Sequence, residues 1–129
     1  MTPEPRHILY LDDDDALVFL VRRLLERRGY KVTAFTDQNE AIEAVRSQPD
    51  AFHLFMTDHN MPGMSGLDVA RAVRAIRPTL PVALSSGYID DALQARALAA
   101  GVREVVLKTD AVDAFCDVVA RLLIPPRPA

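Results

Sequence analysis

The sequence predicts a single α/β domain in which a five-stranded parallel sheet is covered by helices on both faces. Five short apolar runs alternate with five segments that have a helical period. Most of the runs are continuously apolar, as in strands that are buried on both faces of a parallel sheet. At 129 residues, half of them hydrophobic, the chain has the size of one domain with one substantial core.

The five apolar runs are the predicted strands, and short connections join them to the helices. They are HILYL at 7–11, KVTAF at 31–35, FHLFMT at 52–57, PVALS at 81–85 and REVVL at 103–107. Strands that alternate with helices are joined by right-handed crossovers, which make the sheet parallel. For five such units we expect the doubly wound, flavodoxin-like strand order 2-1-3-4-5.

The first two helices have recognisable starts and one clear stop. Asp14 and Asp15 suit the start of the first helix, because aspartate is favourable in the first turn. Gly29 is a stop signal after its apolar stripe, which consists of Leu17, Leu20, Val21, Leu24 and Leu25. Asp37 and Glu40 have the spacing of a capping box at the start of the second helix.

The remaining three helices follow from apolar spacing and from the breakers after them. Val69, Val73 and Ile76 form one stripe that ends before Pro78. An Ala-rich segment at 90–100 ends at a glycine, and a stripe from 112 to 122 that includes Cys116 ends before a proline. We therefore expect a domain at 7–124, between a frayed N-terminus at 1–6 and a Pro-rich tail at 125–129.

Charge and cysteine content exclude several classes of protein. The net charge of −3 and the pI near 5.5 give no electrostatic footprint for nucleic acid or an anionic membrane. A single cysteine cannot form an internal disulfide and fits a reducing compartment. Because no signal peptide is apparent and no apolar run could span a bilayer, we expect a cytoplasmic protein. The last two helices are consistent with either a monomer or a weak dimer.

Polar side chains follow four of the five predicted strands. Asp12 and Asp13 follow the first strand, Asp58 the third and Lys108 the fifth, while Ser85 and Ser86 with Gly87 end the fourth. In open parallel sheets, ligands bind outside the carboxyl ends of the strands. We therefore expect these groups at one edge, with Ser86 in the site. Ser85 is interpreted as structural, since neighbouring side chains on a strand point to opposite faces.

Three aspartates in one pocket raise each other's pKa unless a cation lies among them. The predicted donors are hard carboxylate oxygens without a His or Cys cluster, so Mg²⁺ is the expected ion. A metal, a lysine and a hydroxyl together can bind a phosphoryl group. Asp58, on the central strand, is then a candidate nucleophile that forms an aspartyl phosphate.

The motifs YLDDDD, MTDHNMPGMSG and ALSSG, together with Lys108, resemble those of receiver domains of the two-component response-regulator family. The resemblance covers the chain from His7 to Leu123. It implies that Asp58 is the phosphorylation site and that Asp12, Asp13 and the backbone carbonyl of Asn60 are magnesium ligands, along with Asp58. It also gives Ser86, Gly87 and Lys108 the role of binding the phosphoryl group.

Two residues depart from the family pattern. Thr109 stands where a proline in a cis peptide bond usually follows the lysine, and a cis bond before a non-proline residue costs about 2.5–4 kcal/mol. Val105 stands at the position of the usual aromatic switch residue. Without that ring, the usual coupling to Ser86 cannot operate in the same form, so the output mechanism is left open.

The resemblance implies a phosphoacceptor signalling domain, not an enzyme, which receives phosphate from a histidine kinase or a histidine phosphotransfer protein. The chain is then a single-domain regulator or a receiver from a larger protein such as a hybrid histidine kinase, and its downstream effector is unknown. The main alternative is a pseudo-receiver that binds partners without phosphorylation. An aspartyl-phosphate hydrolase would carry a second aspartate where Asn60 stands, and a flavin carrier would need a Ser/Thr-rich phosphate loop.

Overall fold

The computed structural model describes residues 5–108 and 112–123, and within them five strands alternate with five helices. The strands form one parallel sheet in the order β2-β1-β3-β4-β5, which confirms the predicted fold. In chain order the elements are β1 (His7–Leu11), α1 (Asp15–Arg27), β2 (Lys31–Phe35), α2 (Gln38–Ser47), β3 (Leu54–Asp58), α3 (Gly66–Ile76), β4 (Val82–Ser86), α4 (Asp91–Ala99), β5 (Glu104–Leu107) and α5 (Val112–Leu122).

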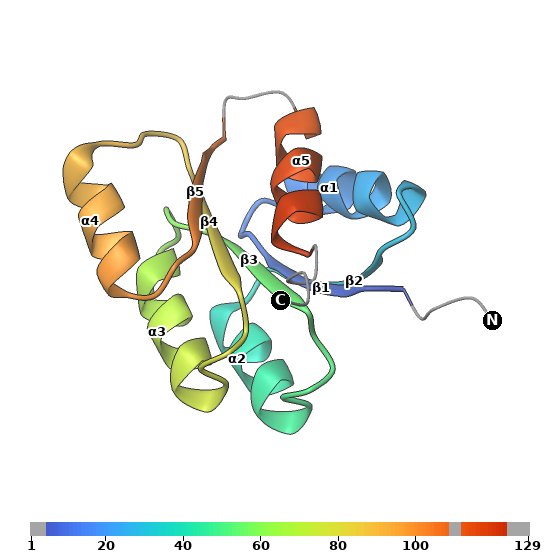
Figure 1. Cartoon of the computed structure of the whole chain (residues 1–129), viewed down its shortest axis with the longest axis horizontal. Helices are drawn as coiled ribbons and strands as arrows, with labels where there is room; N and C mark the ends of the chain where they lie inside the picture. The colour runs from blue at the N-terminus through green and yellow to red at the C-terminus, as the bar shows by residue number, and fades with distance from the viewer. Residues whose placement is uncertain (1–4, 109–111, 124–129) are drawn as a thin grey trace, which may run out of the picture.

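The helices form two layers, one on each face of the sheet (Figure 1). Helices α1 and α5 cover one face and pack on strand residues such as Ile8, Tyr10 and Met56. Helices α2, α3 and α4 cover the other face, where Leu9 and Phe55 belong to the core. Because successive strand side chains alternate between faces, each central strand contributes to both cores.

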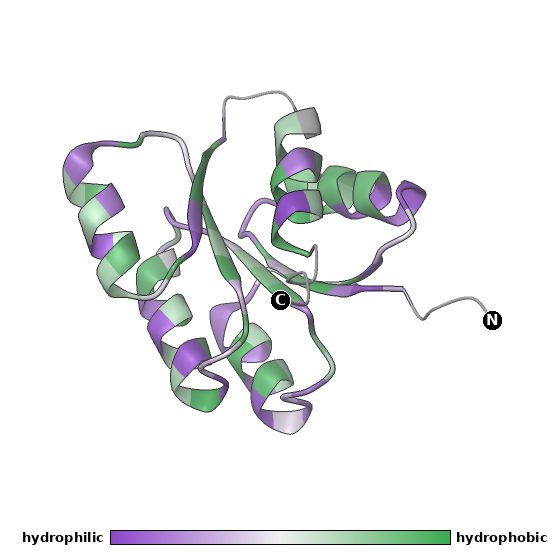
Figure 2. Ribbon diagram, in the orientation of Figure 1, coloured by the Kyte–Doolittle hydropathy of each residue, from purple (hydrophilic) through white to green (hydrophobic). Residues whose placement is uncertain are grey.

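The hydropathy pattern explains why these segments are strands and helices. Figure 2 shows the central strands mostly as hydrophobic residues, while the helices carry hydrophobic and hydrophilic residues on different sides. All five residues of β3 and of β4 are buried, as continuous apolar runs predict. Cys116 is buried in the core beneath α5, as expected of a small hydrophobic side chain.

Side chains cap the N-termini of the helices. The Asp14 carboxylate accepts hydrogen bonds from the backbone N–H groups of Ala16 and Leu17 at 3.0 and 3.2 Å, as predicted for the start of α1. Asp37 accepts a hydrogen bond from the N–H of Glu40 at 2.9 Å. A full capping box, which was not predicted, joins Ser65 and Asp68 at the start of α3.

Some predicted details were wrong. The third strand begins at Leu54, two residues later than predicted, and β3 and β4 each extend one residue further, to Asp58 and Ser86. Leu20, assigned to the apolar stripe of α1, is 45% exposed. Residues 1–4 and 124–129 lie outside the described residues, so most of the predicted N-terminus and the tail stay untested. Among the described residues, no helix is long and apolar enough to cross a membrane.

Candidate functional site

The sheet brings two aspartates and a lysine to its carboxyl edge. Asp12 directly follows β1, Asp58 ends β3, and both are completely or almost completely buried. Lys108 directly follows β5. The residues two positions earlier, which include Tyr10 and Met56, belong to the core under α1 and α5. Since alternate residues of a strand share a face, all three charged side chains arise from that same face.

Lys108 bridges the two buried carboxylates. Its Nζ lies 3.0 Å from Oδ2 of Asp12 and 3.2 Å from Oδ1 of Asp58. Strand β4 lies between β3 and β5, so the side chain of Lys108 crosses β4 to make both contacts. The predicted cluster therefore forms from three strands that are far apart in the sequence.

Further hydrogen bonds hold the two carboxylates in place. The hydroxyl of Tyr10 donates to Oδ2 of Asp12 at 3.2 Å, and the N–H of Asp14 donates to Oδ1 at 3.0 Å. The N–H of Asn60 lies 3.4 Å from Oδ1 of Asp58, a long hydrogen bond. Asp12 thus has partners on both oxygens, whereas Asp58 is less fully bonded.

Burial and neighbouring charge set the protonation of the cluster. Burial raises the pKa of Asp58 above its usual range, the Asp12 charge raises it further, and Lys108 opposes both. Burial alone lowers the pKa of Lys108, but its hydrogen bond to Asp12 and the charges of both aspartates outweigh burial and raise it. Lys108 is therefore a stable cation, and the ionised Asp58 is a costly anion.

The donors at this edge fit a small, hard cation. One carboxylate oxygen from each of Asp12, Asp13 and Asp58 lies within 4.8 Å of the others, and Asp13 is exposed to solvent. Lys108 supplies one positive charge against these three carboxylates. Oxygen ligands with excess negative charge and an open side are what Mg²⁺ uses when it retains several waters.

The loop after β3 is fixed by backbone contacts. The N–H of His59 donates to the carbonyl of Ser85 at 2.8 Å, and the N–H of Gly66 donates to the carbonyl of His59 at 3.0 Å. A Cβ on Gly66 would lie 2.3 Å from the backbone oxygen of Asp58, so only glycine fits there. His59 itself is partly buried.

Ser86 is buried at the edge, but its hydroxyl is turned toward its own loop. Its Oγ donates to the carbonyl of Tyr88 at 2.7 Å and accepts from the Tyr88 N–H at 3.3 Å. Ser86 and Asn60 also line a cavity of about 240 Å³, with Arg96 of α4 on its wall. Gly87 is exposed and has open space around its Cα.

Of the two residues that depart from the family pattern, Val105 lies within the described residues and Thr109 does not. Val105 is partly buried against the core beneath α2, α3 and α4. It pairs with Leu84, two residues before Ser86, so it arises from the same face as Ser86. Thr109 and its peptide bond to Lys108 lie outside the described residues, and the expectation for them stays untested.

Sequence reasoning missed the environment of Ser85. This residue is opposite Asp58 in the sheet register and is only 3% exposed. Among the residues that the structure describes, its Oγ has no hydrogen-bond partner. The alternation rule correctly separated Ser85 from Ser86, but only the register shows that Ser85 shares a face with Asp58.

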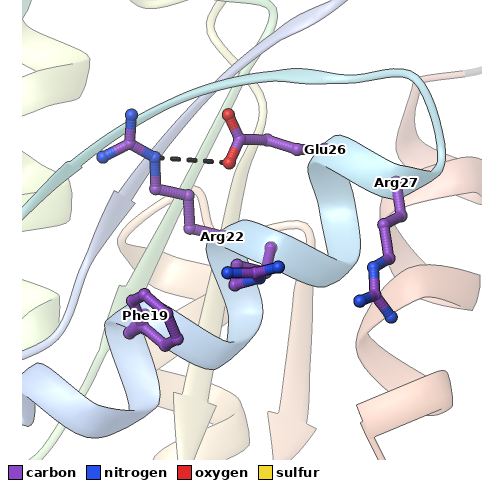
Figure 3. A pocket seen from close by; sticks show the side chains of 5 residues that line it. Phe19, Arg22, Glu26 and Arg27 are labelled. Carbon is purple, nitrogen blue, oxygen red and sulfur yellow. Dashed lines mark ion pairs between the residues drawn. The ribbon is translucent and has the colours of Figure 1, made fainter.

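A larger cavity lies on α1, away from the aspartates. It has a volume of about 560 Å³ and is lined by Phe19, Arg22, Arg23, Glu26 and Arg27. Figure 3 shows Phe19 beside the ion pair of Arg22 and Glu26. The Nε of Arg22 lies 3.5 Å from Oε1 of Glu26. This cavity lacks the paired aspartates and the lysine, so the chemistry described above belongs to the edge of the sheet.

Comparison with known proteins gives one consistent family. The family model for the response regulator receiver domain matches residues 8–120. The response regulator receiver protein CpdR from Brucella abortus is 39% identical over 88 residues, which cover 68% of this chain and 71% of CpdR. The two-component response regulator ARR14 from Arabidopsis thaliana is 33% identical over 84 residues, which cover 65% of this chain and 22% of ARR14.

A solved structure agrees over almost the whole length. The non-phosphorylated HemR receiver domain from Leptospira biflexa matches with a TM-score of 0.86 and 25% identity, covering 96% of this chain and 98% of that one. The chain spans less than a quarter of the length of several curated relatives, ARR14 among them. With the fold, the motifs and the family model in agreement, the chain belongs to the response regulator receiver domain family.

Proposed function

We propose that this receiver domain accepts a phosphoryl group on Asp58 from a phosphohistidine donor, and that the modified domain changes its binding to a partner. The observation that supports this most strongly is the bridge from Lys108 to the buried carboxylates of Asp12 and Asp58, at 3.0 and 3.2 Å. Burying two carboxylates is energetically unfavourable, and the raised pKa of Asp58 reflects this. A functional role for the Asp58 carboxylate would explain why the fold keeps it buried.

The proposed reaction is a phosphoryl transfer to a carboxylate. One oxygen of Asp58 forms a bond to phosphorus, the bond between phosphorus and the donor's imidazole nitrogen breaks, and the electron pair stays on that nitrogen. Lys108, which is already beside Asp58, offsets the negative charge of the phosphoryl oxygens. Positioning and charge stabilisation are most of what a protein can contribute to such a transfer.

We assign the magnesium ligands to Asp12, Asp13, Asp58 and the backbone carbonyl of Asn60. The clustering of the three carboxylates within 4.8 Å supports this assignment. When bound, Mg²⁺ would supply positive charge to the phosphoryl oxygens and would relieve repulsion among the aspartates. Asp13 is the exposed member of the cluster and leaves the ion an open side.

Ser86, Gly87 and Lys108 would bind the phosphoryl group after transfer. For this, the Ser86 hydroxyl must exchange its hydrogen bond with the Tyr88 carbonyl for one with a phosphoryl oxygen. That exchange would release the loop between β4 and α4, whose neighbour Val105 lies on the same face of the sheet. Because Val105 is aliphatic, we infer that the change spreads through loop movement without an aromatic rotamer.

The donor in this proposal is a histidine kinase or a histidine phosphotransfer protein, in keeping with the names of the two-component relatives. The effector is unspecified. The length of several relatives is consistent with a receiver that works beside further domains, such as those of a hybrid histidine kinase.

Acetyl phosphate with Mg²⁺ tests the proposal without a cognate kinase. Purified protein is incubated with both, quenched in acid and weighed intact by mass spectrometry beside Asp58→Asn. We expect one phosphoryl group on the wild type and none on the variant. A pseudo-receiver, to which the aliphatic Val105 would be suited, predicts no adduct on either protein.

A further inference from the structure

Ser85 carries a buried hydroxyl that its surroundings leave unused. The residue is 3% exposed, and its Oγ has no hydrogen-bond partner within residues 5–108 and 112–123. Burying a hydroxyl without a partner destabilises a fold, and alanine at the same place would remove that penalty. A serine here is therefore unfavourable in the present state of the molecule unless another state uses its hydroxyl.

The position of Ser85 in the sheet points to the group that could use it. Ser85 is the register partner of Asp58 on β3 and of Val106 on β5, two residues before Lys108. It arises from the same face as Asp58 and Lys108, because strand side chains alternate. The Lys108 side chain must cross β4 on this face to reach Asp58, and Ser85 is the residue of β4 that is opposite Asp58 in the register.

Lys108 has a hydrogen-bond donor to spare. An ammonium group has three N–H donors, and in the described part of the chain Nζ has two carboxylate partners, Asp12 and Asp58. The Lys108 side chain is only 23% exposed, so water can reach it from one side at most. The third N–H of Lys108, which follows β5, and the Oγ of Ser85 in β4 thus lie on the same face of the sheet.

We propose that Ser85 is a positioning residue for Lys108 in the loaded state of the site, where its Oγ accepts a hydrogen bond from Nζ. The inference rests on the proposed phosphoacceptor role of Asp58. A cation bound at Asp12 would compete with Lys108 for that carboxylate and weaken the contact between them. The ammonium group then draws back over β4 toward Ser85 while it remains beside Asp58. In the loaded state Nζ would donate one hydrogen bond to Asp58, one to a phosphoryl oxygen and the third to Ser85, which takes the place of Asp12.

The Ser85 hydroxyl should therefore affect the unloaded and the loaded protein differently. In the unloaded protein Ser85 contributes no hydrogen bond, so Ser85→Ala leaves stability unchanged or increases it. In the loaded protein the hydroxyl accepts a bond from a charged donor, which is stronger than a neutral one. A purely structural serine would have the same effect in both states.

The test measures binding of beryllofluoride, a phosphoryl mimic, in the presence of Mg²⁺, alongside urea unfolding of the unloaded protein in EDTA. We expect Ser85→Ala to weaken beryllofluoride binding about ten-fold, the effect of one charge-assisted hydrogen bond, while unloaded stability does not fall. Ser85→Thr and Ser85→Val form a matched pair of equal shape, and only the threonine should bind within about three-fold of wild type.

Equal binding by wild type and Ser85→Ala overturns the inference and leaves the proposed function intact. Equal binding by the Thr and Val variants overturns it as well, because the hydroxyl is then irrelevant. An Ala variant that loses as much stability in EDTA as it loses in binding shows a structural role instead. A wild type that binds no beryllofluoride overturns both this inference and the proposed function.

Discussion

Asp58 is a carboxylate that the fold buries at a cost. It is 1% exposed, its pKa is raised first by burial and then by the charge of Asp12, and Lys108 offsets these effects only in part. In the unfolded chain the same carboxyl is solvated and titrates near its ordinary value. Ionised Asp58 therefore destabilises the folded protein relative to the unfolded chain.

Asp58→Asn should make the metal-free protein more stable at neutral pH. The neutral amide avoids the cost of a buried charge and the repulsion from Asp12, so we expect a gain of about 1 kcal/mol in the free energy of unfolding, typical of single substitutions. Urea unfolding in EDTA at pH 7 measures the gain. Asp13→Asn is the matched control, because Asp13 is exposed and should change stability less.

The pH dependence follows from the direction of the pKa shift. Below the ordinary value of 3.8, Asp58 is protonated in the folded and unfolded states alike, so no ionisation cost is present. As the pH rises above 3.8, the carboxyl ionises freely in the unfolded chain while the raised pKa keeps it protonated in the fold, so wild type loses stability that the variant keeps. The gain should therefore grow with pH and level off above that pKa. A gain that is independent of pH would contradict this explanation.

At the residue scale, the sequence was sufficient to identify the charged cluster. Asp12, Asp58 and Lys108 follow strands of one parallel sheet, so topology alone brings them to one edge. The orientation of Ser86 and the isolation of the Ser85 hydroxyl could not be predicted. Rotamer choice and strand register decide both, and neither has a local sequence pattern.

At the scale of elements, the loop between β3 and α3 holds Asp58 in place through the close approach of Gly66. A methyl group at position 66 would lie 2.3 Å from the Asp58 carbonyl oxygen and 2.6 Å from Cδ1 of Leu84. Both neighbours belong to buried strands and cannot move independently. The N-terminus of α3 therefore packs directly against β3, the strand that carries Asp58.

Gly66→Ala should therefore destabilise the protein by about 2 kcal/mol, the usual cost of overpacking a core. Gly87→Ala is the matched control at the same edge of the sheet. Nothing lies within 4 Å of a Cβ there, and its φ is not positive, so we expect a change within about 0.5 kcal/mol. Equilibrium unfolding in urea measures both. Equal losses for the two variants would show that the close approach does not restrict position 66.

Element boundaries were predictable where a local signal exists. Asp14 and Asp37 were predicted to cap their helices, and both accept the expected backbone hydrogen bonds. Ser65 and Asp68 also have capping-box spacing, which the pattern of apolar residues alone did not reveal. Leu20 is exposed because the angular width of a buried stripe depends on how the helix packs, which is a tertiary property.

At the scale of the whole molecule, a chain with a net charge of −3 concentrates acidic groups at one edge of its sheet. Four consecutive aspartates begin at position 12, and strand order adds Asp58 from a distant part of the sequence. Lys108 alone cannot balance the cluster. Cation binding should therefore stabilise the complete fold, because the site exists only when β1 and β3 are paired.

Mg²⁺ should raise the midpoint of thermal unfolding in wild type and much less in Asp13→Asn. A ligand that binds only the folded state stabilises it by about 2.7 kcal/mol at a hundred times its dissociation constant. Asp15→Asn is the control of equal charge change, since Asp15 lies in the first turn of α1 outside the cluster. Equal shifts in the two variants would indicate general charge screening and not a site.

The phosphoacceptor role of Asp58 is decided by locating the phosphoryl group on the chain. Protein phosphorylated with acetyl phosphate and Mg²⁺ is treated with borohydride, which reduces an aspartyl phosphate to homoserine, and its peptides are sequenced by mass spectrometry. We predict homoserine at position 58 and at no other aspartate. Homoserine at Asp12 or Asp13 instead, or its absence from a protein that is otherwise folded, would contradict the assignment of Asp58 as the phosphoacceptor.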